Sequence, residues 1–440
     1  MTKTSGCTRR EWLKHTAAGL VLGPAILRAS ALGAAGRPAP SNRVVLAGIG
    51  MGGQGSGDLG SFIGNPAVQV THVCDVDYTR LQKIMKTVDT KYSSPGACKG
   101  TQDFREVVGR TDIDAVLIAT PDHWHTPIAI AAAKSGKDVY CEKPMSLTIG
   151  GGRAAVDACT RYGRVFQCGS QQRSSREFRL ACELVRNGRI GKIKHVDVGI
   201  PGNNKSCPPT WTPEPVPQEL NYDLWLGPAP WEPYTLQRCH YTFRFLLDYS
   251  GGQVTNWGAH HLDIAQWGLG MDDTGPVQIE GRGAFPQTGL FTVASRVDFT
   301  CTYANGITLR CKTGGGAKVE GEEGLGGGTR FIGESGWIHV NRGKLEASSK
   351  AILDDPIKAT DVRLYESKDH KGNFIDCCIS RKPTICTAEI GHRSASMCHL
   401  GNIAMLLNRT VKWDPAAERF IGDDDANRMI DRTPRVPYDV

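Results

Sequence analysis

Apolar segments alternate with helix-like segments from Arg43 to about Phe166, and this alternation restricts the possible folds more than any other feature of the 440-residue chain. Strand-like, mainly apolar segments occupy residues 44–49, 68–74, 115–120, 139–142 and 165–169, and the first of them is apolar throughout. Segments with a helical pattern lie between them, including 127–135 and 151–162. Continuous apolar strands separated by helices are typical of a parallel sheet that is covered on both faces. We therefore predict an α/β fold in which ligands bind at the carboxyl ends of the strands.

The first predicted strand runs directly into a glycine-rich turn. Gly50, Gly52 and Gly55 fit the pattern G-x-G-x-x-G; an earlier frame over 48–53 also fits, but the later frame leaves a full strand before the turn. Glycine at these positions allows a tight turn and a close approach of the main chain to a pyrophosphate. Asp75 ends the second strand, where a carboxylate accepts hydrogen bonds from ribose hydroxyls and repels a 2′-phosphate. Since no arginine follows Asp75 directly, the pattern favours NAD over NADP, with a ligand-free glycine turn as the alternative.

Two polar segments follow the third and fourth strands, at the edge where the nicotinamide half of a cofactor would lie. They supply the remaining predicted cofactor contacts: Thr120, His123, His125, Glu142 and Lys143. Pro144 biases Lys143 towards extended backbone, which can direct the amine into the cleft. A partly desolvated lysine beside a nicotinamide cation has a lowered pKa. Lys143 is therefore predicted to exchange a proton with a substrate hydroxyl. The alternative for the E-K-P segment is an exposed turn. The alternative for His123 and His125 is a packing or capping role.

The pattern changes after about Gly191. Strand-like alternation at 194–198, 278–284, 296–303 and 308–312 predicts a mostly antiparallel sheet in a second, α+β domain. We therefore place a dinucleotide-binding domain over 42–167 and a second domain over 168–440; the family resemblance described below implies that the second domain binds substrate and mediates oligomerisation.

Residues 1–35 have the composition of an export signal. A Thr-Arg-Arg-Glu-Trp-Leu-Lys segment at 8–14 precedes an uncharged stretch over 16–27 and a run of small residues. The uncharged stretch has 12 residues, whereas a membrane span needs roughly 20. We predict a twin-arginine signal peptide and a periplasmic or otherwise exported protein, with an uncleaved anchor as the alternative. Because this route exports folded proteins, the cofactor should be bound tightly and recycled in place.

Composition argues against two classes of partner. The chain has a net charge of +7, and the export signal contains most of it, so the remainder is too weakly basic to suggest a nucleic-acid partner. The 15 cysteines include no C-x-x-C pair, and the histidines at 123, 125, 260 and 261 define no tetrahedral set, so we expect no metal site.

Four segments resemble the Gfo/Idh/MocA oxidoreductase family, which includes glucose–fructose oxidoreductase and inositol dehydrogenase. They are VVLAGIGMGGQG, ATPDHWH, CEKPMSLT and GGQVTNWGAHHLD. Further segments at 222–230, 241–252 and 422–430 resemble a secreted branch of that family, so the resemblance covers nearly all of the chain after the signal. It implies a Rossmann domain, a C-terminal domain built on a large open sheet, a bound NAD(P), and a sugar or polyol in the cleft. It also implies a dimer or tetramer.

The resemblance assigns catalytic roles to three residues. The lysine of the family's E-K-P motif corresponds to Lys143, and the catalytic histidine of its D-x-G-x-H-x-x-D motif corresponds to His260. Asn256 stands where many members have aspartate, and an amide cannot act as a carboxylate base. Proton transfer would then depend on Lys143 and His260, with Asn256 orienting the substrate. The expected substrate contacts are Gln171, Arg173, Tyr241, Arg244, His261 and Asp263; packing is the alternative role for His261.

The leading hypothesis is oxidation of a hydroxyl on a sugar, polyol or glycoside by a tightly bound, internally recycled NAD(P). A positioned acid–base group contributes on the order of 10²–10⁴ in rate. One alternative is a redox-neutral, NAD-dependent glycosidase that works by oxidation, elimination and reduction. Another is an inactive sugar-binding protein that retains the cofactor.

Overall fold

A computed structural model describes residues 38–39, 42–314 and 327–438. The chain divides into a unit up to Arg43 and a unit from Val44 onwards, and the description below concerns the second unit. The predicted export signal at 1–35 lies outside the described residues.

The first sheet of the structure is entirely parallel and has the strand order β3-β2-β1-β4-β5-β6. Its strands are β1 (Val44–Ile49), β2 (Val68–Cys74), β3 (Lys99–Thr101), β4 (Ala115–Ile118), β5 (Asp138–Cys141) and β6 (Phe166–Cys168). The order reverses direction at β1, so the crevice between the carboxyl ends of β1 and β4 is where a doubly wound sheet binds its ligand.

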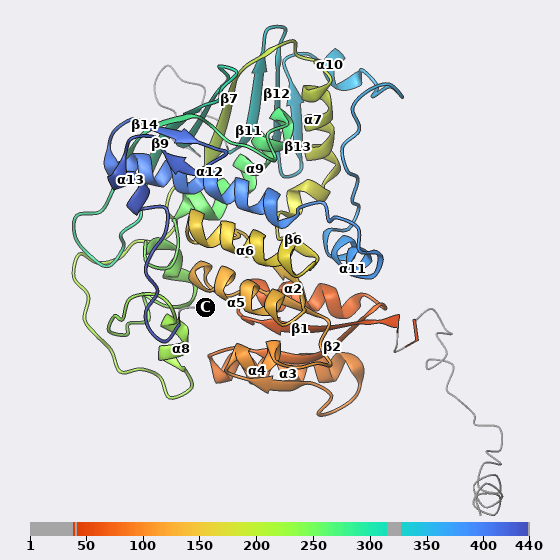
Figure 1. The fold of residues 1–440 in the computed structure, drawn as a ribbon, viewed down its shortest axis with the longest axis vertical. Helices are drawn as coiled ribbons and strands as arrows, with labels where there is room; N and C mark the ends of the chain where they lie inside the picture. Colours follow the sequence, from red (N-terminus) through yellow and green to blue (C-terminus); the bar gives the residue numbers. More distant parts are fainter. Residues whose placement is uncertain (1–37, 40–41, 315–326, 439–440) are drawn as a thin grey trace, which may run out of the picture. The chain divides into compact units, whose positions relative to one another are not determined.

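Helices cover both faces of this sheet (Figure 1). One face packs against α4 (Phe104–Val108), α5 (Asp122–Lys134) and α6 (Ile149–Arg161); the other packs against α2 (Gly53–Gly64), α3 (Tyr78–Tyr92) and α11 (His370–Ser380). Helix α11 comes from the C-terminal part of the chain, and its Phe374 and Ile375 are fully buried against the Rossmann sheet. The two sequence regions are therefore joined by a shared core.

Helix α5 begins five residues earlier than the sequence pattern predicts. The sequence pattern predicted a helical stretch over 127–135. Instead Pro127 lies inside a helix that begins at Asp122, and the earlier start places His123 and His125 on its first turns.

The second sheet is mixed but mostly antiparallel, as predicted; within the described part of the chain, β7 and β10 form its parallel pair. Its order is β13-β12-β11-β7-β10-β9-β8-β14-β15. The strands are β7 (Ile193–Ile200), β8 (Gln278–Ala284), β9 (Arg296–Thr302), β10 (Thr308–Thr313), β11 (Gly328–Gly333), β12 (Trp337–Asn341), β13 (Lys344–Ala347), β14 (Val411–Asp414) and β15 (Arg419–Phe420).

One face of the second sheet packs against α7 (Arg176–Arg186), α9 (Ala259–Leu269) and α12 (Ala388–Leu407). In Figure 1, α12 runs between this sheet and α6 of the Rossmann domain. The shorter helices are η3 (Gln171–Ser174), α8 (Tyr222–Leu226), η4 (His240–Phe245), the π-helical turn η5 (Val254–Gly258), α10 (Lys350–Asp354) and α13 (Asp424–Arg428).

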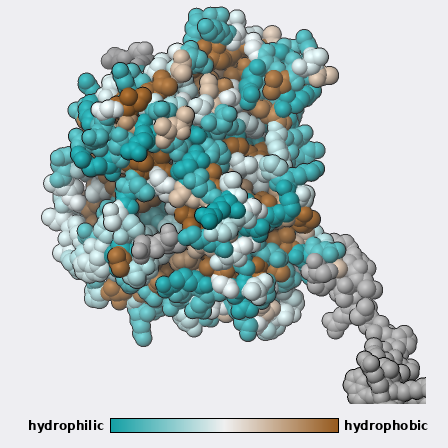
Figure 2. Space-filling view, in the orientation of Figure 1, coloured by the Kyte–Doolittle hydropathy of each residue, from teal (hydrophilic) through white to brown (hydrophobic). Residues whose placement is uncertain are grey.

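The surface in view is mainly hydrophilic, and its hydrophobic residues are scattered (Figure 2). A search of the described helices finds none with the length and apolar character that crossing a bilayer requires.

Candidate active site

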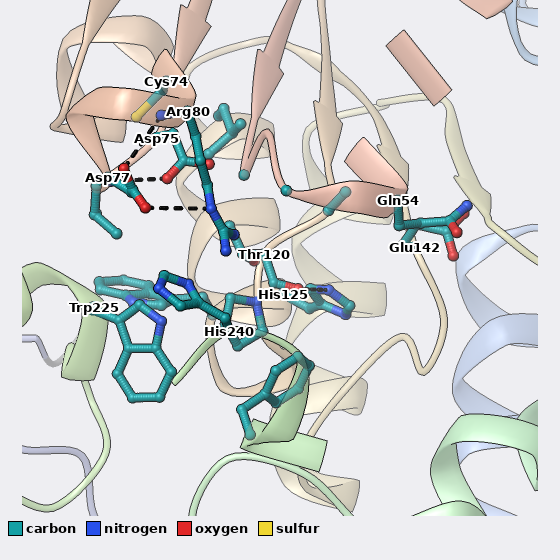
Figure 3. A pocket seen from close by; sticks show the side chains of 18 of the residues that line it. Gln54, Cys74, Asp75, Asp77, Arg80, Thr120, His125, Glu142, Trp225 and His240 are labelled. Atoms are coloured by element: carbon teal, nitrogen blue, oxygen red, sulfur yellow. Dashed lines mark hydrogen bonds and ion pairs between the residues drawn. The ribbon is translucent and has the colours of Figure 1, made fainter. Parts of the chain in front are cut away.

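A cavity of about 540 Å³ lies at the carboxyl edge of the Rossmann sheet. We call it the first cavity. Gly50, Gly52 and Gly53 of the glycine turn line it, and Asp75 and Arg80 lie towards one end. Figure 3 shows Asp75, Asp77 and Arg80 on one side of the view and Gln54 and Glu142 on the other, with Thr120 and His125 between them.

The glycine turn has the close contacts that a pyrophosphate cradle requires. Gly50 has φ +83°, and a Cβ there would lie 2.6 Å from the Thr120 amide nitrogen. A Cβ on Gly55 would lie 2.0 Å from the Gly50 carbonyl oxygen, whereas a Cβ on Gly53 would meet nothing within 4 Å. The N-terminus of α2 has no side-chain cap, so its amides are available to an anion. These residues fit a dinucleotide phosphate group.

Asp75 braces this turn. Its side chain accepts hydrogen bonds from the amides of Met51 (2.6 Å) and Asp77 (2.9 Å), and burial raises its pKa to about 6. Arg80, on α3, reaches back to the cavity and pairs with Asp77 at 3.3 Å. An arginine that binds the 2′-phosphate of NADP would be expected directly after Asp75, where the sequence has none. Arg80 lies five residues further on and still lines the cavity.

A segment of the C-terminal region, residues 219–226, closes one wall of the first cavity. The Tyr78 amide donates to Glu219 O and the Asn221 amide donates to Val76 O, both at 2.9 Å. The Gln102 side chain donates to both of the same carbonyl oxygens. We call this segment the clasp.

Two side chains of α5 extend the attachment of the clasp. Trp124 donates to Leu224 O at 2.9 Å, and His123 Nε2 lies 3.0 Å from Trp225 O. His123 is buried among aromatic rings of the C-terminal region and does not line the first cavity. His125 does line it, with its two ring nitrogens 2.7 Å from Pro144 O and 2.9 Å from Thr120 O.

A second cavity, of about 600 Å³, adjoins the first. The two share five lining residues, namely Gln54, Glu142, Lys143, Tyr241 and Arg244. Asn256, Trp257, His260 and Arg342 line only the second cavity. Lys143 is therefore placed where the contents of the two cavities would meet.

Lys143 is held by Asn256. Its Nζ donates to the Asn256 side-chain oxygen at 2.9 Å and to the Asn256 carbonyl oxygen at 3.0 Å. Burial lowers the pKa of Lys143, the positive charge of Arg244 lowers it further, and Glu142 opposes the shift. Because Asn256 is neutral, it fixes the amine without the charge that would stabilise the ammonium form. A lowered pKa favours the neutral amine, which is the form of Lys143 that can accept a proton.

His260 faces the second cavity from the start of α9. It is 6% exposed, and its Nδ1 has no hydrogen-bond partner within the described residues. Burial lowers the pKa of His260 well below its usual value, and Lys143 acts in the same direction. A neutral imidazole with an unpartnered nitrogen can accept a proton from, or hydrogen-bond to, a bound hydroxyl.

Comparison with known sequence families agrees with this geometry. Residues 42–170 match the profile described as an oxidoreductase family NAD-binding Rossmann fold, and residues 206–440 match that of the oxidoreductase family C-terminal alpha/beta domain. The chain belongs to the Gfo/Idh/MocA oxidoreductase family.

The curated relatives of this Gfo/Idh/MocA chain include glycosidases. An α-N-acetylgalactosaminidase of Shewanella oneidensis is 30% identical over 203 residues, which cover 42% of this chain and 44% of the relative. A glycosyl hydrolase family 109 protein of Shewanella pealeana is 31% identical over 149 residues, 33% of each chain. The chain thus matches less than half the length of these relatives.

Solved structures share the fold over most of their length. The aldose–aldose oxidoreductase of Caulobacter crescentus, complexed with glycerol, has a TM-score of 0.61 and 19% identity, covering 84% of this chain and 99% of that one. The WlbA dehydrogenase of Bordetella pertussis, in complex with NADH and UDP-GlcNAcA, has a TM-score of 0.62 and 17% identity, covering 85% and 98%. At this identity the likeness shows the fold alone.

Three residues expected to bind substrate lie elsewhere in this family member. Arg173 and Asp263 pair with each other at 2.8 Å and are 1% and 0% exposed, and Arg173 also pairs with Asp272. Neither Arg173 nor Asp263 lines either cavity. His261 is buried, stacks beside Trp257 and lines neither cavity.

The other expected substrate contacts do reach the cavities. Gln171 lines the second cavity and donates to Glu142 at 2.6 Å. Tyr241 and Arg244, on η4, line both, with the Arg244 guanidinium 4.8 Å from the centre of the Tyr241 ring.

Sequence reasoning missed several lining residues. Arg342 is at the tip of the β12–β13 hairpin, and Lys371 on α11 pairs with the buried Asp58 of α2 at 2.9 Å. Neither Arg342 nor Lys371 lies in a recognisable sequence motif. Asp58 is the one residue that could have given a signal, because it is an acidic residue among the otherwise uncharged residues of α2. Buried carboxylates are nearly always paired, so a cationic partner such as Lys371 could have been expected.

Within the described residues, no group of three or more His, Cys, Asp or Glu side chains could hold a metal ion.

Proposed function

We propose that this protein oxidises a hydroxyl of a sugar or glycoside, with NAD in the first cavity and the sugar in the second. The observation that carries the proposal is the position of Lys143 at the junction of the two cavities, with the unpartnered nitrogen of His260 on the wall of the second cavity. When bound, the nicotinamide supplies the hydride-accepting carbon. The chain's own residues position the hydroxyl and remove its proton.

The division of labour follows from the contacts. Lys143 has a lowered pKa and a neutral holder in Asn256, so we assign it the role of general base. His260 hydrogen-bonds the same or the adjacent hydroxyl through Nδ1. Asn256 then acts by positioning Lys143, rather than by orienting the substrate as the sequence suggested.

The clasp supports slow release of the cofactor. Its hydrogen bonds to Val76 and Tyr78 lie beside Asp75, at the end of the cavity where the adenosine would bind, so the dinucleotide cannot leave without disturbing them. Tight, recycled binding is what a protein exported by the twin-arginine route to the periplasm would need. We include that route, and association of the chain into dimers or tetramers, in the proposal.

Choice of cofactor belongs to the same proposal. Asp75 favours NAD, but Arg80 places a positive charge at the same end of the first cavity. Competition between NAD and NADP for cofactor-free protein tests this point.

A second candidate function is redox-neutral glycoside cleavage. The relatives named as glycosyl hydrolase family 109 proteins and α-N-acetylgalactosaminidase support it. Lys143 and His260 would then also serve to remove a C–H proton next to the oxidised carbon and to protonate the leaving oxygen.

One experiment separates these functions. Purified protein is mixed with a panel of sugars and glycosides, without added cofactor, while absorbance at the reduced nicotinamide band and release of free sugar are recorded. An absorbance rise without sugar release supports the oxidoreductase, and sugar release supports the glycosidase. Protein that contains and takes up no NAD or NADP at millimolar concentration refutes both.

A further inference from the structure

The second cavity contains more positive than negative charge. Besides the proposed base Lys143, the cationic side chains of Arg244, Arg342 and Lys371 line it, against the carboxyl groups of Glu142 and Asp58. Asp58 is already paired with Lys371 at 2.9 Å. Burial raises the pKa of Glu142, and the neighbouring Asp58 raises it further.

Arg244 and Arg342 have no ion-pair partner in the part of the chain that the structure describes. Arg244 donates to the Tyr241 carbonyl oxygen, and Arg342 lies over Trp257. The guanidinium carbon of Arg244 is 4.7 Å from the Phe243 ring centre, and that of Arg342 is 4.8 Å from the Trp257 ring centre. Stacking on a ring supports the guanidinium plane while its N–H edge remains able to donate.

Arg342 distinguishes a substrate anion from a cofactor phosphate. It stands in the two-residue turn between β12 and β13, with Asn341 paired to Lys344, and it lines only the second cavity. Phosphates of a dinucleotide on the glycine turn would lie in the first cavity. Arg244 lines both cavities and could serve either, so the argument depends on Arg342.

We propose that the second cavity selects an acidic sugar, and that Arg342 binds its carboxylate or sulfate group while Arg244 assists. The inference rests on the proposed function, because it places the rest of that sugar beside Lys143 and His260. A planar guanidinium can donate two parallel hydrogen bonds to a carboxylate or to two sulfate oxygens. Arg342 is exposed at the hairpin tip and Arg244 is half-buried. A neutral sugar would therefore leave both guanidinium groups to water alone, whereas an acidic sugar would give them an anion to bind.

The test measures equilibrium binding to the intact protein with its cofactor, by calorimetry and by quenching of tryptophan fluorescence. The ligands are methyl glucosides, the matching methyl glucuronides and the matching glucoside 6-sulfates, together with the same three ligands in the galacto series. We expect at least one acidic ligand to bind ten or more times tighter than its neutral counterpart. Comparing the uronate with the sulfate identifies which anion is preferred.

Variants connect the preference to the arginine. Arg342→Gln should remove the acidic preference, a loss of about tenfold to a hundredfold in affinity for the acidic ligand. Arg342→Lys should retain part of it because it keeps the charge but not the fork geometry. Arg282→Gln, at an exposed arginine on β8 that lines neither cavity, is the matched control and should change nothing.

The outcomes separate this inference from the proposed function. If no acidic ligand in either series binds more tightly than its neutral counterpart, or if Arg342→Gln keeps the preference, the inference is wrong. Acidic ligands that bind with the expected preference but never change the nicotinamide absorbance and never release sugar would refute the proposed function alone. Turnover of neutral sugars only would refute the inference alone.

Discussion

The two cavities meet at Lys143 but are built differently. The first is lined mainly by turns that directly follow strands β1, β2, β4 and β5, so short contiguous motifs specify most of it. The second collects side chains from Gln54, Gln171, Asn256, Arg342 and Lys371, which the chain brings together from distant positions. A cofactor common to many proteins leaves a recurring local pattern, whereas a substrate pocket depends on how two domains pack. The following predictions test that contrast, from the largest expected effect to the smallest.

The strongest test of the locally specified cavity is Gly55→Ala. A Cβ at Gly55 would lie 2.0 Å from the Gly50 carbonyl oxygen, so the turn must move. We expect the variant to lose detectable NAD binding at millimolar concentration. The matched control is Gly57→Ala in the same helix, where a Cβ meets nothing within 4 Å. That control should keep NAD and gain about 0.5–1 kcal/mol in free energy of unfolding. Equal NAD affinity in the two variants would contradict the assignment of the glycine turn as the pyrophosphate-binding site.

The junction of the cavities is tested by Lys143→Ala. Removing the proposed base should lower kcat by about 10²–10⁴ while NAD binding persists. Cofactor content measured by absorbance, and turnover measured with the sugar identified in the panel, give the two readings. Lys344→Ala, at a surface lysine, is the control. A Lys143→Ala protein with full activity would end the assignment.

The difference between a substrate contact and a core contact is tested at Arg173. Its buried pairing with Asp263 and Asp272 makes it a structural residue. Arg173→Gln should lower the free energy of unfolding by about 3–5 kcal/mol, because it leaves buried carboxylates without their cation. Thermal unfolding measures the loss, with Arg176→Gln at an exposed position as the control. An unchanged Tm together with a raised KM would instead restore the substrate-binding role.

The neutral holder of Lys143 is tested by Asn256→Asp. A carboxylate 2.9 Å from the amine would stabilise the ammonium form and raise the pKa of Lys143 by about 1–3 units. A base acts in its deprotonated form, so the rise of kcat/KM with pH should move to higher pH by the same amount. The control Asn305→Asp, in an exposed turn, should leave the profile in place. A shift to lower pH would contradict the role of Lys143 as base.

The clasp gives the smallest effect. Gln102→Leu removes the side-chain hydrogen bonds to Val76 and Glu219, and each hydrogen bond contributes about 0.5–1.5 kcal/mol. NAD release, followed by trapping with a competing dehydrogenase, should become several times faster. Gln218→Leu, at an exposed residue beside the clasp, should leave the rate unchanged. An unchanged rate of NAD release in Gln102→Leu would show that these hydrogen bonds of the clasp do not slow cofactor release.

Sequence reasoning predicted the elements better than it predicted the side-chain environments. The parallel sheet, the second sheet and the glycine turn follow from apolar periodicity and from the conformational needs of Gly50, which are local properties. The placement of Arg173, His261 and Arg342 could not be predicted in this way. His260 and His261 are adjacent in sequence, and only the packing of α9 determines that His260 lines the second cavity while His261 is buried beside Trp257.

The sequence alone determined a dinucleotide-binding Rossmann domain and a lysine at the carboxyl edge of its sheet, because glycine spacing and strand periodicity act over a few residues. Only the tertiary structure decided which charges surround that lysine. The neutral partner Asn256, the cavity-lining Arg342 and the clasp all come from chain segments more than 70 residues away in sequence from Lys143. Electrostatic effects depend on distance in space and on burial, and neither can be read from the order of residues along the chain.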